Sequence, residues 1–333
     1  MPGLLRLLLD IMKILIVGGT SFVGRAIAHA AVEKGHEVSV LNRGKSPNDL
    51  PDSVHRLIGD RQGDLSVLDG KSFDATIDAI AYRPKDVELL ANALGGRGGH
   101  YIQISSISAY KYPGATGATE STPLIELGDL DLEAPVDGNT YGPLKAASER
   151  AAHEHFGSDI GIIRPTYVIG SYDKTMRFPY WVARIQRGGK VAFPGPANSS
   201  MQWIDARDLG AFTVLMAEKK FIGGVHVCNP SLGAGFGEVM ERIAKRVGPS
   251  DAELVEISPS KLSDSKWFEK FPLWSGGFDP TSLALSNEYA VSLGLALRSL
   301  EESIDDTAQW LITTPWQENW LDADDEKTLF ADS

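Results

Sequence analysis

A tyrosine and a lysine four residues apart are the side chains of this sequence best suited to chemistry. Tyr141 and Lys145 stand in a segment of helical composition, and Pro143 falls in its first turn, where a helix tolerates proline. We expect Thr140 or Asn139 to cap this helix. Residues four apart share one face of a helix, so the phenol and the ammonium are predicted to project in the same direction.

The glycine-rich stretch near the start of the chain predicts a dinucleotide site. Residues 14–17 are apolar, Gly18 follows them, and the chain then continues with helical composition. This order predicts a buried strand, a tight turn and a helix over 22–34. Gly18 permits the turn, Gly24 lets the helix pack on the sheet, and the free N–H groups of the helix favour a phosphate. The residues predicted to bind the cofactor here are Gly18, Thr20, Ser21, Phe22, Val23 and Gly24.

The end of the second predicted strand, 36–41, bears on the choice between the two nicotinamide dinucleotides. An acidic residue here binds the ribose 2′-OH of NAD, whereas a basic residue accommodates the 2′-phosphate of NADP. Residues 42–45 read Asn-Arg-Gly-Lys, without a carboxylate. We therefore expect NADP(H), with Arg43 as the phosphate partner. NAD(H) stays open as the alternative, because Asn42 could bond a bare ribose.

Strands and helices alternate through the first half of the chain. Further strands at 54–58, 75–79 and 101–106 and a helix at 84–94 favour an α/β fold with a parallel, doubly wound sheet of the Rossmann type. Such sheets bind ligands beyond the carboxyl ends of their strands. The cofactor contacts predicted from these strand ends are Asp60, which we place near adenine, and Ala79, Ile80, Ala81 and Ser105.

Together these elements predict proton transfer by Tyr141 next to a nicotinamide. A phenol is a poor base at neutral pH, and lowering its pKa from about 10 to about 7 requires about 4 kcal/mol. We expect the ammonium of Lys145 and a positively charged nicotinamide, in a partly dry site, to supply this. Tyr141 would then remove or donate a hydroxyl proton. Ser106 would hydrogen-bond the substrate oxygen and stabilise its negative charge.

Composition narrows the classes of function. The 333 residues suffice for one large α/β unit or for a domain with a lobe. The net charge of −12 repels phosphate backbones, so we expect no nucleic-acid partner. The single cysteine, Cys228, excludes an intrachain disulfide and fits a reducing cytoplasm. Residues 1–11 are too short to span a bilayer, so no membrane contact is expected, and the histidines lack metal-ligand spacing.

The order of these motifs resembles the short-chain dehydrogenase/reductase superfamily, in the extended or atypical branch of NAD-dependent epimerases/dehydratases. The resemblance covers nearly the whole chain and implies an NAD(P)-dependent enzyme with the catalytic triad Ser106, Tyr141 and Lys145. It further implies that Lys145 binds the nicotinamide ribose. An Arg-Pro-Thr-Tyr-Val-Ile-Gly run resembles the strand-six motif, which implies cofactor contacts from Pro165 and Val168. Dimers are common in the superfamily, which implies a homodimer.

Departures from the pattern of this branch bear on the substrate. Its dehydratases carry an Asp-Glu pair where residues 107–108 are Ile-Ser, so dehydration is not expected. Its nucleotide-sugar epimerases carry an arginine where we read Met201 and an asparagine where we read Tyr167, which argues against a nucleotide-diphosphate substrate. A displaced arginine, Arg177 or Arg207, could compensate. The residues expected to line the substrate pocket are Tyr82, Ser108, Tyr167, Arg177, Trp181, Gln202 and Trp203.

Three hypotheses follow for the function. The first is a cytoplasmic NADP(H)-dependent oxidoreductase that transfers a hydride to or from a secondary alcohol or ketone carbon of a small polar, sugar-like metabolite, with Tyr141 as acid and base. The second is an epimerase of a sugar or nucleotide sugar that keeps its NAD bound. The third is an RNA-binding protein, because the Gly-Asp-Arg motif at 59–61 resembles chloroplast stem-loop-binding relatives of this branch. The negative charge and the intact tyrosine–lysine pair argue against the third.

The chain divides into four segments in our interpretation. They are a leader expected to be disordered (1–11), an NAD(P)-binding Rossmann domain (12–170), a smaller substrate lobe partly interleaved with the sheet (171–321), and an acidic tail expected to fray (322–333). Within the lobe, Asp208 is expected to cap the helix that follows it. Residues 225–228 are predicted to form a strand that joins the sheet or the lobe.

Overall fold

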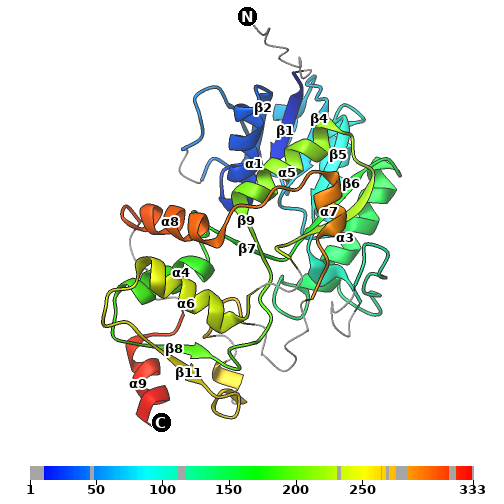
Figure 1. The fold of residues 1–333 in the computed structure, drawn as a ribbon. Helices are drawn as coiled ribbons and strands as arrows, with labels where there is room; N and C mark the ends of the chain where they lie inside the picture. Colours follow the sequence, from blue (N-terminus) through cyan, green and yellow to red (C-terminus); the bar gives the residue numbers. More distant parts are fainter. Residues whose placement is uncertain are drawn as a thin grey trace, which may run out of the picture.

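The computed structural model shows a sheet flanked by helices at one end and a smaller group of helices and short strands at the other (Figure 1). The structure describes residues 11–45, 49–111, 118–230, 234–263, 265–267, 270–274, 284–314 and 320–331. Of the predicted leader, only Ile11 belongs to the described residues, and its side chain is exposed. The prediction made for residues 1–10 therefore lies outside them.

Within the described residues, seven parallel strands form the central sheet, which confirms the predicted doubly wound fold. Their order across the sheet is β3-β2-β1-β4-β5-β6-β10. The chain begins in the middle, at β1, and the strand order reverses there, which is where sheets of this kind bind ligands. The strands are β1 (Lys13–Val17), β2 (Glu37–Asn42), β3 (His55–Ile58), β4 (Ala75–Asp78), β5 (His100–Ile104), β6 (Gly161–Pro165) and β10 (Gly223–Val227).

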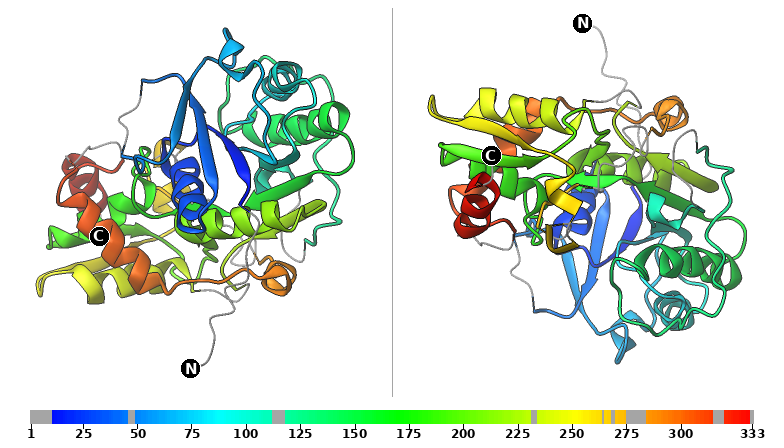
Figure 2. Two further views of the ribbon diagram at one scale, coloured as in Figure 1. Left: turned by 90° about the horizontal axis from the view of Figure 1, so that it is seen from above. Right: turned by 90° about the horizontal axis from the view of Figure 1, so that it is seen from below.

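Alternate residues of β1 face two opposite layers of helices. Ile14 and Ile16 belong to the core under α1 and α5, whereas Leu15 and Val17 belong to the core under α2 and α3. Because both faces are covered, every position after the first is apolar and buried. Figure 2 shows the two layers on opposite sides of the sheet. The helices are α1 (Phe22–Glu33), α5 (Ala206–Glu218), α2 (Pro84–Leu94) and α3 (Tyr141–Phe156).

A second core forms around Trp181 from the part of the chain that follows β6. Trp181 is fully buried, and its ring centroid lies 5.5 Å from that of Phe236 and 6.3 Å from that of Phe271. The sheet strand β10 and helix α5 lie within the same stretch of sequence, so this lobe and the sheet are interleaved along the chain. The remaining helices are α4 (Arg177–Gln186), α6 (Phe236–Val247), α7 (Glu288–Leu293), α8 (Leu300–Leu311) and α9 (Ala323–Ala331). The remaining strands are β7 (Tyr167–Ile169), β8 (Lys190–Pro194), β9 (Trp203–Asp205) and β11 (Glu253–Ile257).

Thr140, one of the two residues predicted to cap α3, stands at the N-cap position, but its side chain does not cap the helix. Thr140 has a helical backbone conformation, and its side chain makes no capping hydrogen bond to the helix. Its hydroxyl donates to the carbonyl of Pro135 instead. Asp137 accepts from the N–H groups of Asn139 and Thr140 at 2.8 and 3.0 Å, so a carboxylate orders the turn before Tyr141.

The start of α5 also corrects an expectation. The capping residue is Asp205, which has an extended backbone and accepts from the N–H of Arg207 at 2.8 Å. Asp208 lies in the first turn and accepts from the backbone N–H of Arg298 at 2.9 Å. The prediction placed the cap one turn too late, because both aspartates stand close to the strand-to-helix junction.

The acidic C-terminal segment is a packed helix in the structure, which corrects the expectation of a frayed tail. Helix α9 buries Glu326 and Leu329. Glu326 accepts from Arg184 of α4, with Nε–Oε distances of 3.0 Å and an Nη2–Oε2 distance of 2.8 Å. Acidic composition alone suggests solvation, but one carboxylate paired with a buried arginine and one leucine in the second core are enough to dock the helix.

Candidate active site

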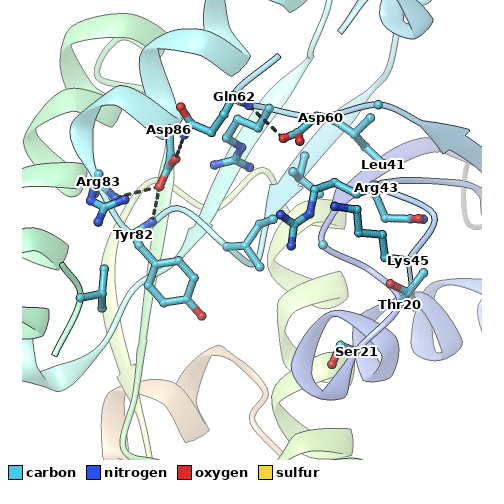
Figure 3. A pocket seen from close by; sticks show the side chains of 17 residues that line it. Thr20, Ser21, Leu41, Arg43, Lys45, Asp60, Gln62, Tyr82, Arg83 and Asp86 are labelled. Atoms are coloured by element: carbon cyan, nitrogen blue, oxygen red, sulfur yellow. Dashed lines mark hydrogen bonds between the residues drawn. The ribbon is translucent and has the colours of Figure 1, made fainter. Parts of the chain in front are cut away.

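A cavity of about 440 Å³ lies beyond the carboxyl ends of the first four strands of the chain (Figure 3). This size falls in the range of sites for small molecules and cofactors. The predicted cofactor residues in its lining are Gly18, Thr20, Ser21, Asn42, Arg43, Asp60 and Ile80. The other lining residues are Val17, Leu41, Lys45, Gly59, Arg61, Gln62, Tyr82, Arg83, Asp86 and Val136.

The glycine turn between β1 and α1 fits a dinucleotide. Gly18 has a φ angle of +85°, in the left-handed region that favours glycine. A Cβ atom on Gly24 would lie 2.2 Å from the carbonyl oxygen of Gly18, so the helix approaches the turn as closely as only glycine allows. The N-terminus of α1 offers N–H groups to a pyrophosphate, and Arg43 and Lys45 offer charge to a 2′-phosphate.

The two basic side chains after β2 lie in the cavity without an acidic partner among the described residues. Arg43 and Lys45 extend from the end of β2 towards the middle of the cavity in Figure 3. Neither forms an ion pair with another residue in the part of the chain that the structure describes. A cavity wall with two uncompensated cations favours an anionic group of the ligand.

On the opposite wall, Asp86 organises the loop between β4 and α2. Its carboxylate accepts from Gln62 Nε2 at 2.6 Å and from the backbone N–H groups of Tyr82 and Arg83, both at 3.0 Å (Figure 3). Arg83 in turn donates to the carbonyl of Ala134 from Nε at 3.2 Å and from Nη2 at 2.8 Å. This wall therefore joins the cavity to the segment that precedes Tyr141.

The structure brings Ser106, Tyr141 and Lys145 together at the end of β5, beside the cavity but outside its lining. Ser106 lies close enough to the phenol of Tyr141 to lower its pKa. Lys145 Nζ lies 6.0 Å from the ring centroid of Tyr141. The same ammonium donates to the carbonyl oxygens of Ala81 and Ile104, each at 2.9 Å. The serine, the phenol and the ammonium thus form one cluster.

The pKa of Tyr141 differs from the sequence-based expectation. Burial raises the pKa of this phenol above its ordinary value, although the hydrogen bond from Ser106 and the charge of Arg177 act in the opposite direction. Burial also lowers the pKa of Lys145 to about 8, against the charges of Asp78 and Glu149. In the protein alone, desolvation therefore outweighs the predicted effect of the ammonium on the phenol.

A buried ion pair behind the cluster ties its elements together. Glu149, on α3, accepts from Arg164 of β6, with Nε–Oε1 and Nη2–Oε2 distances of 2.9 and 2.6 Å. Ser105, at the end of β5, donates its hydroxyl to the same carboxylate. Arg164 also donates to the hydroxyl of Tyr110 at 3.3 Å. The helix that carries Tyr141 and the strand end that carries Ser106 therefore share one charged anchor.

Several predicted cofactor residues do not line the cavity. They are Phe22, Val23, Gly24, Ala79, Ala81, Ser105, Pro165 and Val168. Ala81 is completely buried and contributes its carbonyl to Lys145, and the hydroxyl of Ser105 is directed to Glu149. Pro165 and Val168 are buried on β6 and β7. Ala81 and Ser105 therefore contact the catalytic cluster, through Lys145 and Glu149, instead of the cavity.

Three of the predicted substrate residues lie close to the triad. The ring centroids of Tyr82 and Tyr141 are 6.4 Å apart. Ser108 accepts from the Ser106 hydroxyl at 3.2 Å through its own oxygen. Arg177 begins α4 and donates from Nε to Asp173 at 3.2 Å. Burial raises the pKa of both phenols, and the charge of Arg177 opposes this at each.

The other predicted substrate residues lie elsewhere, which corrects those expectations. Trp181 belongs to the second core, and its indole N–H donates to the carbonyl of Pro272 at 2.9 Å. Gln202 is completely buried, and its side-chain amide exchanges two hydrogen bonds of 2.9 Å with the backbone of Leu285. Trp203 lines a different cavity, and Tyr167 packs against the second core. Aromatic side chains in this lobe are used for packing.

Sequence reasoning did not assign several residues of the cavity wall. These are Arg61, Gln62, Arg83, Asp86 and Val136. Arg61 directly follows Asp60, the residue predicted to lie near adenine, so its place in the sequence could have indicated that it lines the cavity. It is buried and donates from Nη2 to Asp78 Oδ1 at 2.7 Å. Val136 had no such signal, because it lies in an irregular segment far along the chain.

The chain matches the NAD dependent epimerase/dehydratase family over residues 14–228 and belongs to this family. The matched region runs from β1 to the residue after β10 and contains Ser106, Tyr141 and Lys145. Enzymes of this family bind a nicotinamide dinucleotide, which agrees with the glycine turn and the cavity described above. The family thus defines the class of the protein as a dinucleotide-dependent enzyme with a Rossmann-type fold.

Individual relatives have low sequence identity to this chain. The chain is 25% identical over 271 residues to the chloroplast stem-loop binding protein of 41 kDa b from Arabidopsis thaliana, covering 76% of this chain and 68% of that protein. It is 27% identical over 213 residues to a bifunctional pinoresinol-lariciresinol reductase from Thuja plicata, covering 61% of this chain and 64% of that protein. The chain therefore spans about two thirds of the length of these curated relatives. The structure of a UDP-N-acetylglucosamine 4-epimerase from Bacillus cereus superimposes with a TM-score of 0.66 at 15% identity, over 93% of this chain and 99% of that chain, which shows the shared fold.

Two other kinds of site are absent from the described residues. None of the helices that the structure describes combines the length and the apolar character needed to cross a membrane. The same residues contain no group of three or more histidine, cysteine, aspartate or glutamate side chains placed to hold a metal ion.

Proposed function

We propose that this protein is an NADP(H)-dependent oxidoreductase that interconverts a secondary alcohol and a ketone in a small polar, sugar-like metabolite. The observation that carries the proposal is the position of Arg43 and Lys45, which have no ion-pair partner among the described residues, in the cavity next to Ser106 and Tyr141. The family supports dinucleotide chemistry, and the relative from Thuja plicata named as a reductase supports this direction of reaction.

The residues of the site suit reduction of a carbonyl group. When bound, the nicotinamide supplies or accepts the hydride. The raised pKa of Tyr141 keeps its phenol protonated at neutral pH, so it is ready to donate a proton to the substrate oxygen. Ser106 donates a hydrogen bond to the same oxygen as negative charge develops there. The ammonium of Lys145 orients the ribose and favours the phenolate that remains after proton donation.

The cofactor preference is tested by titrating the protein with NADPH and with NADH while following cofactor fluorescence. Arg43→Ala is expected to weaken NADPH binding by about tenfold to a hundredfold, because a charge-assisted phosphate contact is lost. NADH binding should stay within about twofold of the unmodified protein. Arg56→Ala is the matched control, since Arg56 is exposed on β3 and does not line the cavity. Equal losses for both cofactors would contradict the assignment of Arg43 to the 2′-phosphate.

Turnover tests the role of Tyr141. Tyr141→Phe removes only the hydroxyl, so NADPH affinity should be retained while carbonyl reduction falls by about a hundredfold to ten-thousandfold. Tyr289→Phe serves as the control, because Tyr289 lies on α7 with 43% of its surface exposed. Full activity of the Tyr141 variant would remove this residue from the mechanism.

An epimerase that oxidises and re-reduces one carbon is the second candidate. It is favoured by the family description and uses the same serine, tyrosine and lysine. The two candidates differ in how they hold the cofactor. A dinucleotide that co-purifies and survives dialysis supports the epimerase, whereas free exchange of NADPH supports the oxidoreductase.

A further inference from the structure

Tyr82 separates the cavity from the catalytic cluster. Tyr82 belongs to the cavity lining, whereas Ser106, Tyr141 and Lys145 do not. The centroid of the Tyr82 ring lies 4.6 Å from Lys145 Nζ. The centroid of the Tyr141 ring is more distant from the same nitrogen, at 6.0 Å. A molecule in the cavity therefore meets the Tyr82 ring before it meets the ammonium.

The Tyr82 ring covers the one donor of the Lys145 ammonium that is left after its two hydrogen bonds to carbonyl oxygens. An ammonium has three donors, and two of them are used by the carbonyl oxygens of Ala81 and Ile104, each at 2.9 Å. Lys145 is buried, and the Tyr82 ring packs over its ammonium as a cation–π contact. The remaining donor becomes available to a ligand only when this ring moves away.

The side chain of Tyr82 is held by few contacts. Its backbone N–H is fixed to Asp86 at 3.0 Å, but its hydroxyl has no hydrogen-bond partner among the residues that the structure describes. The residue retains 39% of its surface exposed. Figure 3 shows the ring projecting from the loop after β4, away from the Asp86 side of the wall. The backbone is therefore anchored by a hydrogen bond, whereas no hydrogen bond to a described residue holds the ring.

We propose that the ring of Tyr82 is a gate between the dinucleotide cavity and the catalytic cluster, and that the nicotinamide half of the cofactor takes the place of this ring over Lys145. The proposal rests on the proposed function, since it requires a dinucleotide in the cavity. Binding then has two steps: the adenosine half enters the cavity first, and the gate opens afterwards. Because Ala81 and Ile104 hold Lys145 independently of the ring, the ammonium stays in place when the gate opens.

Stopped-flow measurement of NADPH fluorescence tests the gate. The unmodified protein is expected to bind NADPH in two phases, with a slow phase whose rate levels off as the NADPH concentration rises. Tyr82→Ala should remove the slow phase, so that equilibrium is reached about tenfold faster, the change expected when a desolvated cation–π contact is lost. Tyr82→Phe keeps the ring and should keep the slow phase. Tyr289→Ala, at a residue of similar exposure on α7, is the matched control.

Binding of adenosine 2′,5′-bisphosphate tests whether Tyr82 acts as a gate or only supports the structure of the cavity. This probe lacks the nicotinamide half, so calorimetry should give the same affinity for the unmodified protein and for Tyr82→Ala. A loss of affinity for both ligands would mean that Tyr82 only supports the cavity, which overturns the gate. Identical single-phase NADPH binding in both proteins would also overturn it and would leave the cofactor assignment intact. No binding of NADPH to the unmodified protein would overturn the proposed function and the gate with it.

Discussion

At the scale of single residues, the site combines groups whose properties are set by burial as much as by neighbours. Lys145 has no carboxylate within hydrogen-bonding distance among the described residues and is held by two carbonyl oxygens and two aromatic rings. Desolvation dominates in such surroundings, so the pKa of the lysine falls and that of Tyr141 rises. The pKa values of the two groups therefore lie further apart than those of a free lysine and a free tyrosine, and the phenol stays protonated at a pH where the lysine loses its charge.

This arrangement predicts a pH dependence of cofactor binding. Burial lowers the pKa of Lys145 to about 8, so its charge is present below that pH and is lost as the pH rises through it. The affinity of the free protein for NADPH should therefore decline above about pH 8. Lys145→Met, which carries no charge at any pH, should bind more weakly at pH 7 and lack this step. Parallel pH profiles of the two proteins would contradict a role for the lysine charge in binding.

At the scale of elements, α3 is positioned by an ion pair rather than by apolar packing alone. Glu149 and Arg164 join α3 to β6, and Ser105 adds the end of β5 through the same carboxylate. All three side chains are buried. An interior ion pair of this kind adds little net stability compared with apolar residues, but it fixes geometry. Removing one partner leaves the other charge buried without a counter-charge.

We predict that Glu149→Gln lowers the free energy of unfolding by about 3 to 5 kcal/mol, because Arg164 is left buried without a counter-charge. Chemical denaturation followed by circular dichroism measures this loss. Glu126→Gln is the control, since Glu126 pairs with Lys111 on the surface and its ion pair is exposed. Its midpoint should not change measurably. A midpoint for Glu149→Gln equal to that of the control would show that the pair does not anchor α3.

At the scale of the whole molecule, the chain forms two cores, and the segments that build them alternate along the sequence. The sheet takes up β10 and α5 from the same stretch that contributes α4 and α6 to the second core, and α9 closes that core at the end of the chain. Figure 1 shows α9 beside the β8–β11 strand pair, far from the sheet. Helix α9 thus contributes to the second core.

The packing of α9 predicts a stability effect close to the C-terminus. Leu329 is 3% exposed in the second core, so Leu329→Ala should destabilise the protein by about 2 to 4 kcal/mol. Lys327→Ala, on the exposed side of the same helix, should leave the urea midpoint unchanged. If the two variants unfold at the same urea concentration, α9 does not belong to the folded core.

The fold class, the glycine turn and the shared face of Tyr141 and Lys145 could be predicted from the amino-acid sequence alone. These features depend on local rules: the apolar run of a buried strand, the φ angle at Gly18, and the four-residue spacing of a helix face. Three contacts could be seen only in the folded chain: Tyr82 covers Lys145, Glu149 binds Arg164, and Trp181 packs in a core instead of lining a substrate pocket. Such contacts join loops and helices far apart in the chain, and their partners are chosen by packing and desolvation, which no local pattern records.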